Sequence, residues 1–198
     1  MMNRKHTIIS TLTCLLLFSS LLSCAPSPSR VGYGALKKQQ PTVTVAILEK
    51  QIHILINHER RNRGLSRLAW DDTLNAIARK HSKDMAKRNY FAHLSPEGRD
   101  FMFRYKQAGY SCGIRVNSTV LPGEENIAVN NLSDSIATVN GIVYHEWNSQ
   151  EKIAETTVEG WMKSTGHRKN ILTPHWLHEG IGVFIAPDGK VYITQNFC

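Results

Sequence analysis

The sequence lacks several features that would place it in a special class of protein. Only four of its 198 residues are cysteine, and a chain of this length can bury a sizeable core without disulfides or metals. It contains no internal repeat and no basic run interleaved with aromatic residues, so nucleic-acid binding is not expected. The apolar stretch at residues 8–22 is too short to be assigned as a membrane span.

Signatures of catalysis are also missing. The sequence has no His-Glu-x-x-His pattern of the kind found in zinc proteases. The pair His58-Glu59 begins like that pattern, but Asn62 stands where its second histidine would be. No serine or cysteine nucleophile motif accompanies the histidines. These absences favour a protein that is not an enzyme, and only metal-assisted hydrolysis stays open as a catalytic alternative.

The composition is that of an ordinary globular chain, with 41% hydrophobic and 20% charged residues. The length suits one domain with appendages. The formal net charge is +8, and such an excess favours contact with anionic envelope polymers or lipid headgroups. A soluble surface that is merely basic is the simpler alternative.

The N-terminal residues predict a targeting segment. A charged start at residues 4–6 precedes the apolar stretch, as in a signal peptide. The stretch ends in Leu21-Leu22-Ser23-Cys24, which resembles a bacterial lipobox. We expect residues 1–23 to be a lipoprotein signal peptide and Cys24 to carry acyl chains such as palmitate. The protein would then be exported and anchored in a membrane, facing the periplasm or the cell surface. An ordinary secretory signal or an uncleaved anchor is the alternative.

Residues 24–45 are rich in Pro, Ser, Gly and Gln and predict a flexible tether from the lipidated cysteine. Cys14 would leave with the signal peptide and Cys24 would carry the lipid, so Cys112 and Cys198 remain. Outside the cytoplasm these two can form a disulfide. Two unpaired thiols are the alternative.

Hydrophobic periodicity and capping residues predict the elements of one domain over residues 46–198. Helices are expected at 46–63, from Asp71 or Asp72 to about 89, from 100 to 109 and at about 153–164. Strands at 180–186 and 190–197 flank Pro187-Asp188-Gly189, a hairpin turn. Residues 122–128 are expected to be part of a loop region, and residues 130–150 have no assignable pattern. Helices first and a hairpin last predict an α+β domain.

Five pieces of sequence stand in a fixed order. They are Leu68-Ala69-Trp70-Asp71, His93-Leu94-Ser95-Pro96-Glu97-Gly98, Gly123-Glu124-Glu125-Asn126-Ile127-Ala128, the stretch from Trp161 to Leu172, and Gly180-Ile181-Gly182-Val183 with Thr194-Gln195-Asn196-Phe197. In this order they resemble the CAP superfamily (cysteine-rich secretory, antigen 5 and pathogenesis-related proteins), particularly its bacterial branch. The resemblance implies a three-layer α-β-α sandwich with a cleft on one face.

The same resemblance implies the residues of that cleft: His93, Glu125 and His167, with Asn126 and Ser164 beside them. Many family members have a second Glu where this chain has Ser164. Some members bind zinc through the two histidines, so His93 and His167 are the candidate ligands of a weak, open metal site completed by water and Glu125. Zinc is therefore a candidate cofactor and no cofactor is certain.

Two imidazoles and a carboxylate in one cleft allow three roles. They can bind a divalent metal, they can perform acid–base catalysis with Glu125 orienting a histidine or acting as the base, or they can form a polar network that holds the cleft loops together. We favour a cleft that binds a ligand or holds its loops together over a cleft that catalyses a reaction.

These observations lead to a lipid-anchored module that binds a small molecule, a lipid or a cell-envelope component. The alternative is a metal-assisted hydrolase of envelope peptide or glycan, with His93, Glu125 and His167 as its candidate catalytic residues. A third possibility is an adhesion protein that uses residues 129–150, a segment longer than usual for the family, as its contact site. The sequence indicates neither the ligand nor the oligomeric state.

Overall fold

The structure is a computed structural model that describes residues 40–140 and 142–198. The expected signal peptide, the lipidation site Cys24 and most of the tether lie outside the described residues. The helices are α1 (Val45–Arg61), α2 (Asp72–Arg88), α3 (Phe101–Gln107), α4 (Gln150–Lys163) and α5 (Thr165–Leu172). Within the described ranges, none of them has both the length and the apolar character that a membrane crossing requires.

The strands form one main sheet and two separate hairpins. The main sheet has the order β1-β7-β8-β4. Its members are β1 (Ala69–Trp70), β4 (Glu124–Asn131), β7 (His178–Ile185) and β8 (Lys190–Phe197). β7 and β8 make the expected hairpin, and β4 pairs antiparallel with β8 from Glu124 opposite Phe197 to Asn131 opposite Lys190. β4 is thus an edge strand of this sheet.

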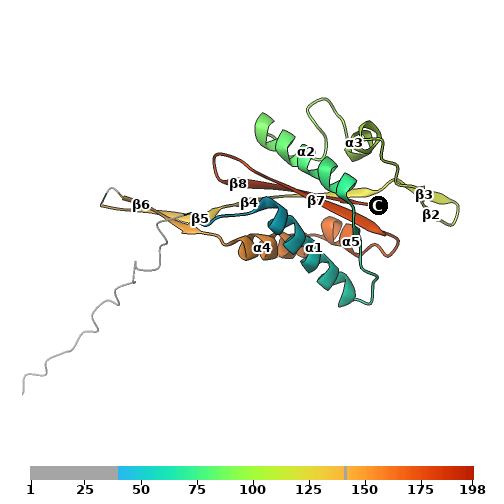
Figure 1. The fold of residues 1–198 in the computed structure, drawn as a ribbon, viewed down its shortest axis with the longest axis horizontal. Coiled ribbons are helices and arrows are strands. Elements are labelled where there is room, and N and C mark those ends of the chain that lie inside the picture. The colour runs from blue at the N-terminus through green and yellow to red at the C-terminus, as the bar shows by residue number, and fades with distance from the viewer. Residues whose placement is uncertain (1–39, 141) are drawn as a thin grey trace, which may run out of the picture. The chain divides into compact units, whose positions relative to one another are not determined.

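Helices cover both faces of the main sheet. Figure 1 shows α2 and α3 on one side and α1, α4 and α5 on the other, so the three-layer α-β-α sandwich is confirmed. Two helices begin where the sequence predicted, because Asp71 and Asp100 accept hydrogen bonds from the amides of Leu74 and Phe103. Such side-chain caps satisfy amides that have no partner inside the helix.

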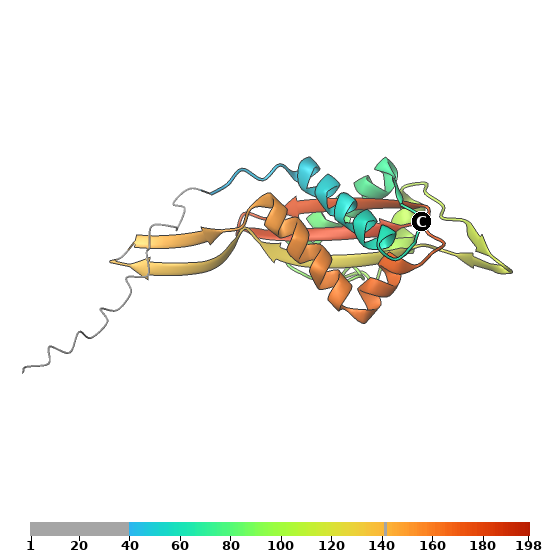
Figure 2. The same ribbon diagram turned by 90° about the horizontal axis from the view of Figure 1, so that it is seen from below.

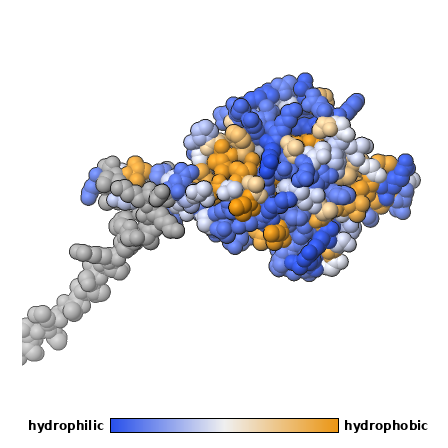
Figure 3. Space-filling model, viewed as in Figure 1, coloured by the Kyte–Doolittle hydropathy of each residue, from blue (hydrophilic) through white to orange (hydrophobic). Residues whose placement is uncertain are grey.

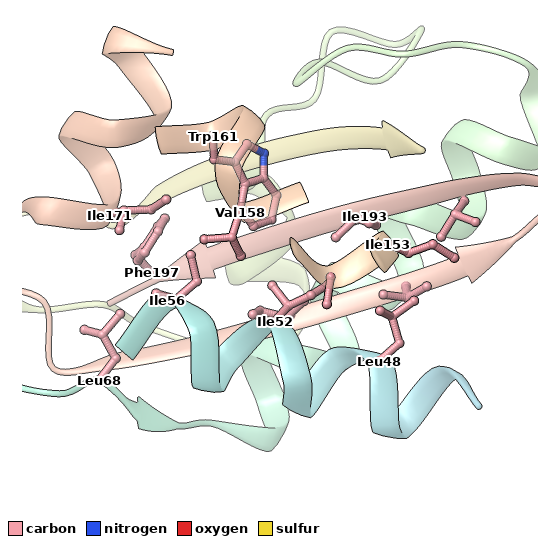
Figure 4. Packing of buried hydrophobic residues seen from close by; sticks show 14 of the residues in the cluster. Leu48, Ile52, Ile56, Leu68, Ile153, Val158, Trp161, Ile171, Ile193 and Phe197 are labelled. Carbon is pink, nitrogen blue, oxygen red and sulfur yellow. The ribbon is translucent and has the colours of Figure 1, made fainter. Parts of the chain in front are cut away.

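The larger core lies between the sheet and α1 with α4 (Figure 4). Leu48, Ile52 and Ile56 recur every fourth residue along α1 and are fully buried. They pack in one cluster with Trp161 of α4 and Ile193 of β8. The spacing places these side chains on one helix face, which is why the sequence alone located this helix.

α2 lies unusually close to β7 on the other face of the sheet. A Cβ on Gly182 would stand 1.9 Å from the backbone nitrogen of Arg79, and one on Gly180 would stand 2.1 Å from that of Asn75. At this short range the Ser82 hydroxyl donates a hydrogen bond of 2.8 Å to the carbonyl of Gly182. The two glycines therefore set the height of α2 above the sheet.

Two hairpins project from opposite ends of the sandwich in both ribbon views (Figures 1 and 2). One is formed by β2 (Ile114–Val116) and β3 (Thr119–Leu121), and the other by β5 (Ser133–Val139) and β6 (Ile142–Trp147). The second hairpin occupies the segment that the sequence pattern could not assign. The residues from Glu124, expected in a loop region, are the start of β4, since they gain backbone partners only through β8.

Candidate functional site

The site is built around the first residues of β4. Gly123 enters the strand with φ +104, and a Cβ there would stand 2.6 Å from the carbonyl oxygen of Phe197. A residue with a side chain would be strained in this conformation. The next residues, Glu125 and Asn126, pair with Asn196 and Gln195 of β8. Because successive strand residues point to opposite faces, the Glu125 and Asn126 side chains leave the sheet edge on opposite sides.

Glu125 is a buried carboxylate with several partners. Its side chain is only 1% exposed. Arg104 of α3 donates from Nη2 to Oε2 at 2.6 Å, and His93 Nδ1 lies 3.0 Å from Oε1. His81 of α2 lies 3.8 Å from the same Oε1 through its Nε2 atom. Both carboxylate oxygens are therefore engaged from the α2–α3 side of the sheet.

His93 stands in the loop between α2 and α3 and is open to solvent. Its side chain is 49% exposed, and its carbonyl accepts a hydrogen bond of 3.1 Å from Arg104 Nη2. The loop that follows is closed by Ser95, whose amide donates to the carbonyl of Arg99 at 3.0 Å and whose hydroxyl accepts from the amide of Glu97 at 3.3 Å. These contacts of Ser95 therefore hold the shape of the loop that follows His93.

His167 reaches the site from α5, on the other face of the sheet. Its carbonyl accepts a hydrogen bond of 3.2 Å from Asn126 Nδ2, and Asn126 Nδ2 also donates to Gln195 Oε1 at 3.0 Å. Asn170 of α5 donates to Asn126 Oδ1 at 3.0 Å. Asn126 is fully buried, so its amide ties α5 to the sheet edge.

The pKa values of two histidines, His167 and His81, are lowered, which favours the neutral imidazole in both. Burial lowers the pKa of His167 from its ordinary value, and the nearby charge of His93 lowers it further. Burial also lowers the pKa of His81. The negative charge of Glu125 opposes this shift, and the positive charge of Arg104 adds to it.

Ser164 occupies the junction of α4 and α5. It is the C-cap of α4 and the N-cap of α5, and its hydroxyl makes no capping hydrogen bond. Its amide donates to the carbonyls of Gly160 and Trp161, and its carbonyl accepts from Arg168. Within the described residues it therefore holds the turn between the two helices by backbone contacts.

The expected disulfide is present. Cys112 and Cys198 are bonded, with 5.3 Å between their Cα atoms and a separation of 86 positions in sequence. Both are buried, in a small cluster with Leu74, Ile77 and Tyr105. The bond therefore connects the end of β8 to the segment that follows α3.

Arg104 and His81 are the site residues that sequence reasoning missed. Nothing local distinguishes Arg104 from the other cations of its short helix, because its partner lies 21 residues further along the chain. His81 carried a weak signal. It lies on the apolar face of α2 with Leu74 and Met85, and a histidine at such a position needs a polar partner inside the protein.

The sequence predicted a weak metal site with His93 and His167 as its ligands. In the part of the chain that the structure describes, no three side chains of His, Cys, Asp or Glu are arranged as a metal site. The donors that suit a divalent ion are the imidazoles of His93 and His167. Glu125 stands behind His93 with both oxygens engaged, so it suits the role of an orienting partner better than that of a ligand.

The comparisons with known proteins match this architecture. A sequence model of the cysteine-rich secretory protein family, called CAP, matches residues 53–197. The chain belongs to the CAP family. This match spans four of the five helices in full, most of the fifth, and the whole main sheet, so the CAP domain contains every residue of the site described above.

Two relatives from Bacillus subtilis strain 168 are similar to this CAP domain. YkwD is 34% identical over 161 residues, covering 78% of this chain and 48% of YkwD. The membrane protein YlbC is 33% identical over 177 residues, covering 86% of this chain and 38% of YlbC. The chain thus spans less than half the length of these two relatives.

Solved structures show the same fold. An extracellular protein with an SCP domain from Bacillus anthracis has a TM-score of 0.56 and 29% identity, covering 77% of this chain and 40% of that one. An outer surface protein from Borrelia burgdorferi has a TM-score of 0.58 and 15% identity, covering 80% of this chain and 97% of that one. The second likeness concerns the fold alone.

Proposed function

We propose that the chain is an exported CAP-domain binding module, held at a membrane by lipid on Cys24. Its cleft between His93 and His167 binds a small molecule, a lipid or a cell-envelope component, and takes up a divalent metal weakly. Export is supported by the similarity to the extracellular Bacillus anthracis protein and to the membrane protein YlbC. The lipid anchor rests on the Leu21-Leu22-Ser23-Cys24 sequence.

The contact between His93 and Glu125 carries the proposal for the cleft. A carboxylate accepts a hydrogen bond, so His93 donates from Nδ1, and Nε2 is the ring nitrogen left to face a ligand. A histidine that binds a metal commonly has a carboxylate behind its second nitrogen, which fixes the ring. Since the His93 side chain is 49% exposed, Nε2 is presented to a ligand that enters from solvent.

The donor set fits a divalent ion such as zinc, held by His93 and His167 with water completing the coordination. Such an ion supplies Lewis-acid character to whatever it binds. Burial lowers the pKa of His167, which favours the neutral ring that a metal needs. Tight zinc sites have three or four protein ligands, so two imidazoles support weak uptake.

The arrangement of Glu125 favours binding over the metal-assisted hydrolase. A general base must accept a proton from an attacking water. The Glu125 side chain is 1% exposed, and its oxygens face Arg104 at 2.6 Å and His93 at 3.0 Å. Water would have to displace one of these contacts, so the carboxylate acts as an orienting group in the cleft we propose.

Zinc binding tests the cleft directly. We expect calorimetry to show zinc uptake by the soluble domain, reduced at least tenfold in His93→Ala and in His167→Ala. His58→Ala is the matched control, because His58 is exposed on α1 and has no place in the cleft. Equal uptake by all four proteins would rule out the metal part of the proposal.

Ligand screening tests the binding module. Native mass spectrometry and thermal shift with envelope lipids and glycans should find a compound that stabilises the wild type and not the His93→Ala variant. A screen in which no compound stabilises the wild type counts against the binding role.

The anchor has a separate test. Mass spectrometry of the mature protein from the membrane fraction should give the mass of a chain that begins at residue 24 and carries acyl groups. The Cys24→Ala variant should be released from the membrane. An unmodified Cys24 in the mature chain contradicts the anchor.

A further inference from the structure

A groove lies between α2 and α3, next to the site around Glu125. It encloses about 570 Å³ and is walled by α2, by the loop around residues 95–99 and by α3. Neither His93 nor His167 lines it. His81 and Arg104 belong to its wall and approach Glu125 from the same side of the sheet as His93. The groove therefore adjoins the site around Glu125, but its occupant does not depend on the function proposed above, because neither proposed metal ligand lines it.

The groove carries a row of uncompensated positive charges. Lys80, Lys83 and Lys87 line it from α2 and are exposed. Residues three and four apart lie on the same helix face, so the three ammonium groups form a single row. In the residues that the structure describes, none of the three is part of a salt bridge. The acids of the groove, Asp84 and Glu97, both pair with Arg88 instead.

The lining of the groove also has an apolar part. Its residues are Ala76 and Ile77 of α2, Phe103 of α3, and Ala108 directly after α3. The Arg99 guanidinium lies 4.8 Å from the centre of the Phe103 ring, so one face of that ring is already covered. A ligand that suits this groove has negative charges along one edge and short hydrocarbon or polyol units between them.

We propose that the α2–α3 groove binds an extended polymer of polyol units linked by phosphodiesters. The rise of an α-helix places the three lysines about 4.5 and 6 Å apart along the axis, a spacing that an extended chain of phosphodiesters can follow. The polyol carbons would lie on Ala76, Ile77 and Phe103. The hydrophilic surface over α2 in Figure 3 agrees with a polar, charged ligand there.

The shape of the charge row argues against two other anions. A single lipid headgroup is best held by cations that converge on one point, whereas these lysines are strung out in a line along α2. Single-stranded nucleic acid is usually held by several aromatic side chains on which successive bases stack. The groove offers the ring of Phe103 alone, with one face covered by Arg99.

The test uses a fluorescent oligo(glycerol phosphate) as the probe, with binding measured by anisotropy at several salt concentrations. The groove variant combines Lys80→Gln, Lys83→Gln and Lys87→Gln. The matched control combines Lys152→Gln, Lys163→Gln and Lys169→Gln, which removes the same charge from exposed positions of α4 and α5 on the other side of the sheet.

We expect the wild type and the control to bind alike and the groove variant to bind at least tenfold more weakly. The slope of log affinity against log salt should become shallower by about 2 in the groove variant, since each phosphate contact contributes about 0.7 for a single chain. Equal losses in the two triple variants would show that net charge alone attracts the polymer, and full binding by the groove variant would show that the groove is not the site.

Two competitor probes complete the test. Tighter binding of a single-stranded oligonucleotide, or of vesicles of phosphatidylglycerol, than of the oligo(glycerol phosphate) would overturn the assignment of the polymer. Zinc uptake by the groove variant should equal that of the wild type, so failure of this proposal can be told from failure of the histidine cleft. A thermal melt of each variant checks that it is folded.

Discussion

At the scale of single residues, the site depends on the burial of one carboxylate. Glu125 is 1% exposed and its main cationic partner, Arg104, is 12% exposed. Removing one partner of a buried pair leaves the other charge uncompensated, and this costs about 3–5 kcal/mol. The histidines beside Glu125 are favoured in their neutral forms or open to solvent, so they do not replace the guanidinium.

We expect Arg104→Leu to lower the free energy of unfolding by about 3 kcal/mol in urea denaturation, near the low end of that range because Arg104 is not fully buried. Adding Glu125→Leu should recover part of the loss. Arg88→Leu, which breaks an exposed pair with Glu97, is the control and should change stability little. A double variant less stable than Arg104→Leu alone would contradict this account of Glu125.

His81 adds a pH dependence at the same scale. Its pKa lies below the ordinary value of 6.5, first because of burial. Below pH 6.5 the unfolded chain then binds more protons than the folded one, so stability present above this pH is lost as the pH falls. His167, whose pKa is lowered in the same direction, contributes similarly.

When the pH is lowered from about 7.5 to about 5.5, we expect the urea midpoint to fall less in His81→Gln than in the wild type. The reason is that the variant lacks one group whose protonation is linked to unfolding. The comparison uses the change with pH within each protein, so an overall loss of stability in the variant does not affect it. An identical or steeper decline in the variant would show that His81 does not titrate in this way.

At the scale of elements, the packing of α2 on β7 depends on glycine. A Cβ on Gly182 would overlap the backbone of α2 at Arg79 and Ala78, and backbone cannot rotate away as a flexible side chain can. Overpacking of this kind costs about 1–3 kcal/mol or more. The distance between helix and sheet also sets where His81 stands relative to Glu125.

Gly182→Ala should therefore lower the free energy of unfolding by about 3 kcal/mol and weaken zinc uptake, as α2 is pushed from the sheet. Gly160→Ala is the control. Gly160 lies inside α4 with no atom within 4 Å of an added Cβ, so alanine should stabilise the protein by about 0.5–1 kcal/mol. Chemical denaturation of both variants measures these changes in stability. A Gly182→Ala variant as stable as the wild type would show that α2 moves at little cost.

At the scale of the whole molecule, one covalent bond joins distant parts of the chain. Cys112 and Cys198, 86 positions apart, close a loop that contains every strand from β2 to β8, both projecting hairpins included, and the helices α4 and α5. Closing so long a loop restricts the unfolded chain and stabilises the fold by up to about 4–5 kcal/mol in the chain-entropy model. The fold therefore depends on an oxidising compartment for part of its stability.

The variant with both Cys112→Ser and Cys198→Ser should melt at a lower temperature than the oxidised wild type, with a loss of about 2–5 kcal/mol. Reducing agent should lower the wild-type melting temperature to a similar extent and leave the double variant unaffected. A wild type whose melting temperature is the same with and without reductant would contradict a stabilising role for the bond.

The sequence by itself determined the elements whose signal is local. Leu48, Ile52 and Ile56 recur at helical spacing, so α1 could be located within a few residues. Asp71 and Asp100 mark where α2 and α3 begin, because a capping side chain acts on amides three residues away. The turn at residues 187–189 likewise belongs to one short segment. The ordered motifs carried the family resemblance and, with it, the three-layer fold.

Only the tertiary structure decided what depends on distant partners. Glu124–Asn131 is a strand because β8 supplies its backbone hydrogen bonds, and those partners lie 59 to 73 residues further along the chain. Arg104 gains its role only when α3 is brought to Glu125. The row of lysines on α2 becomes the wall of a groove only because α3 lies opposite. Local periodicity contains no information about such contacts, since they are made between residues that meet only after the chain has folded.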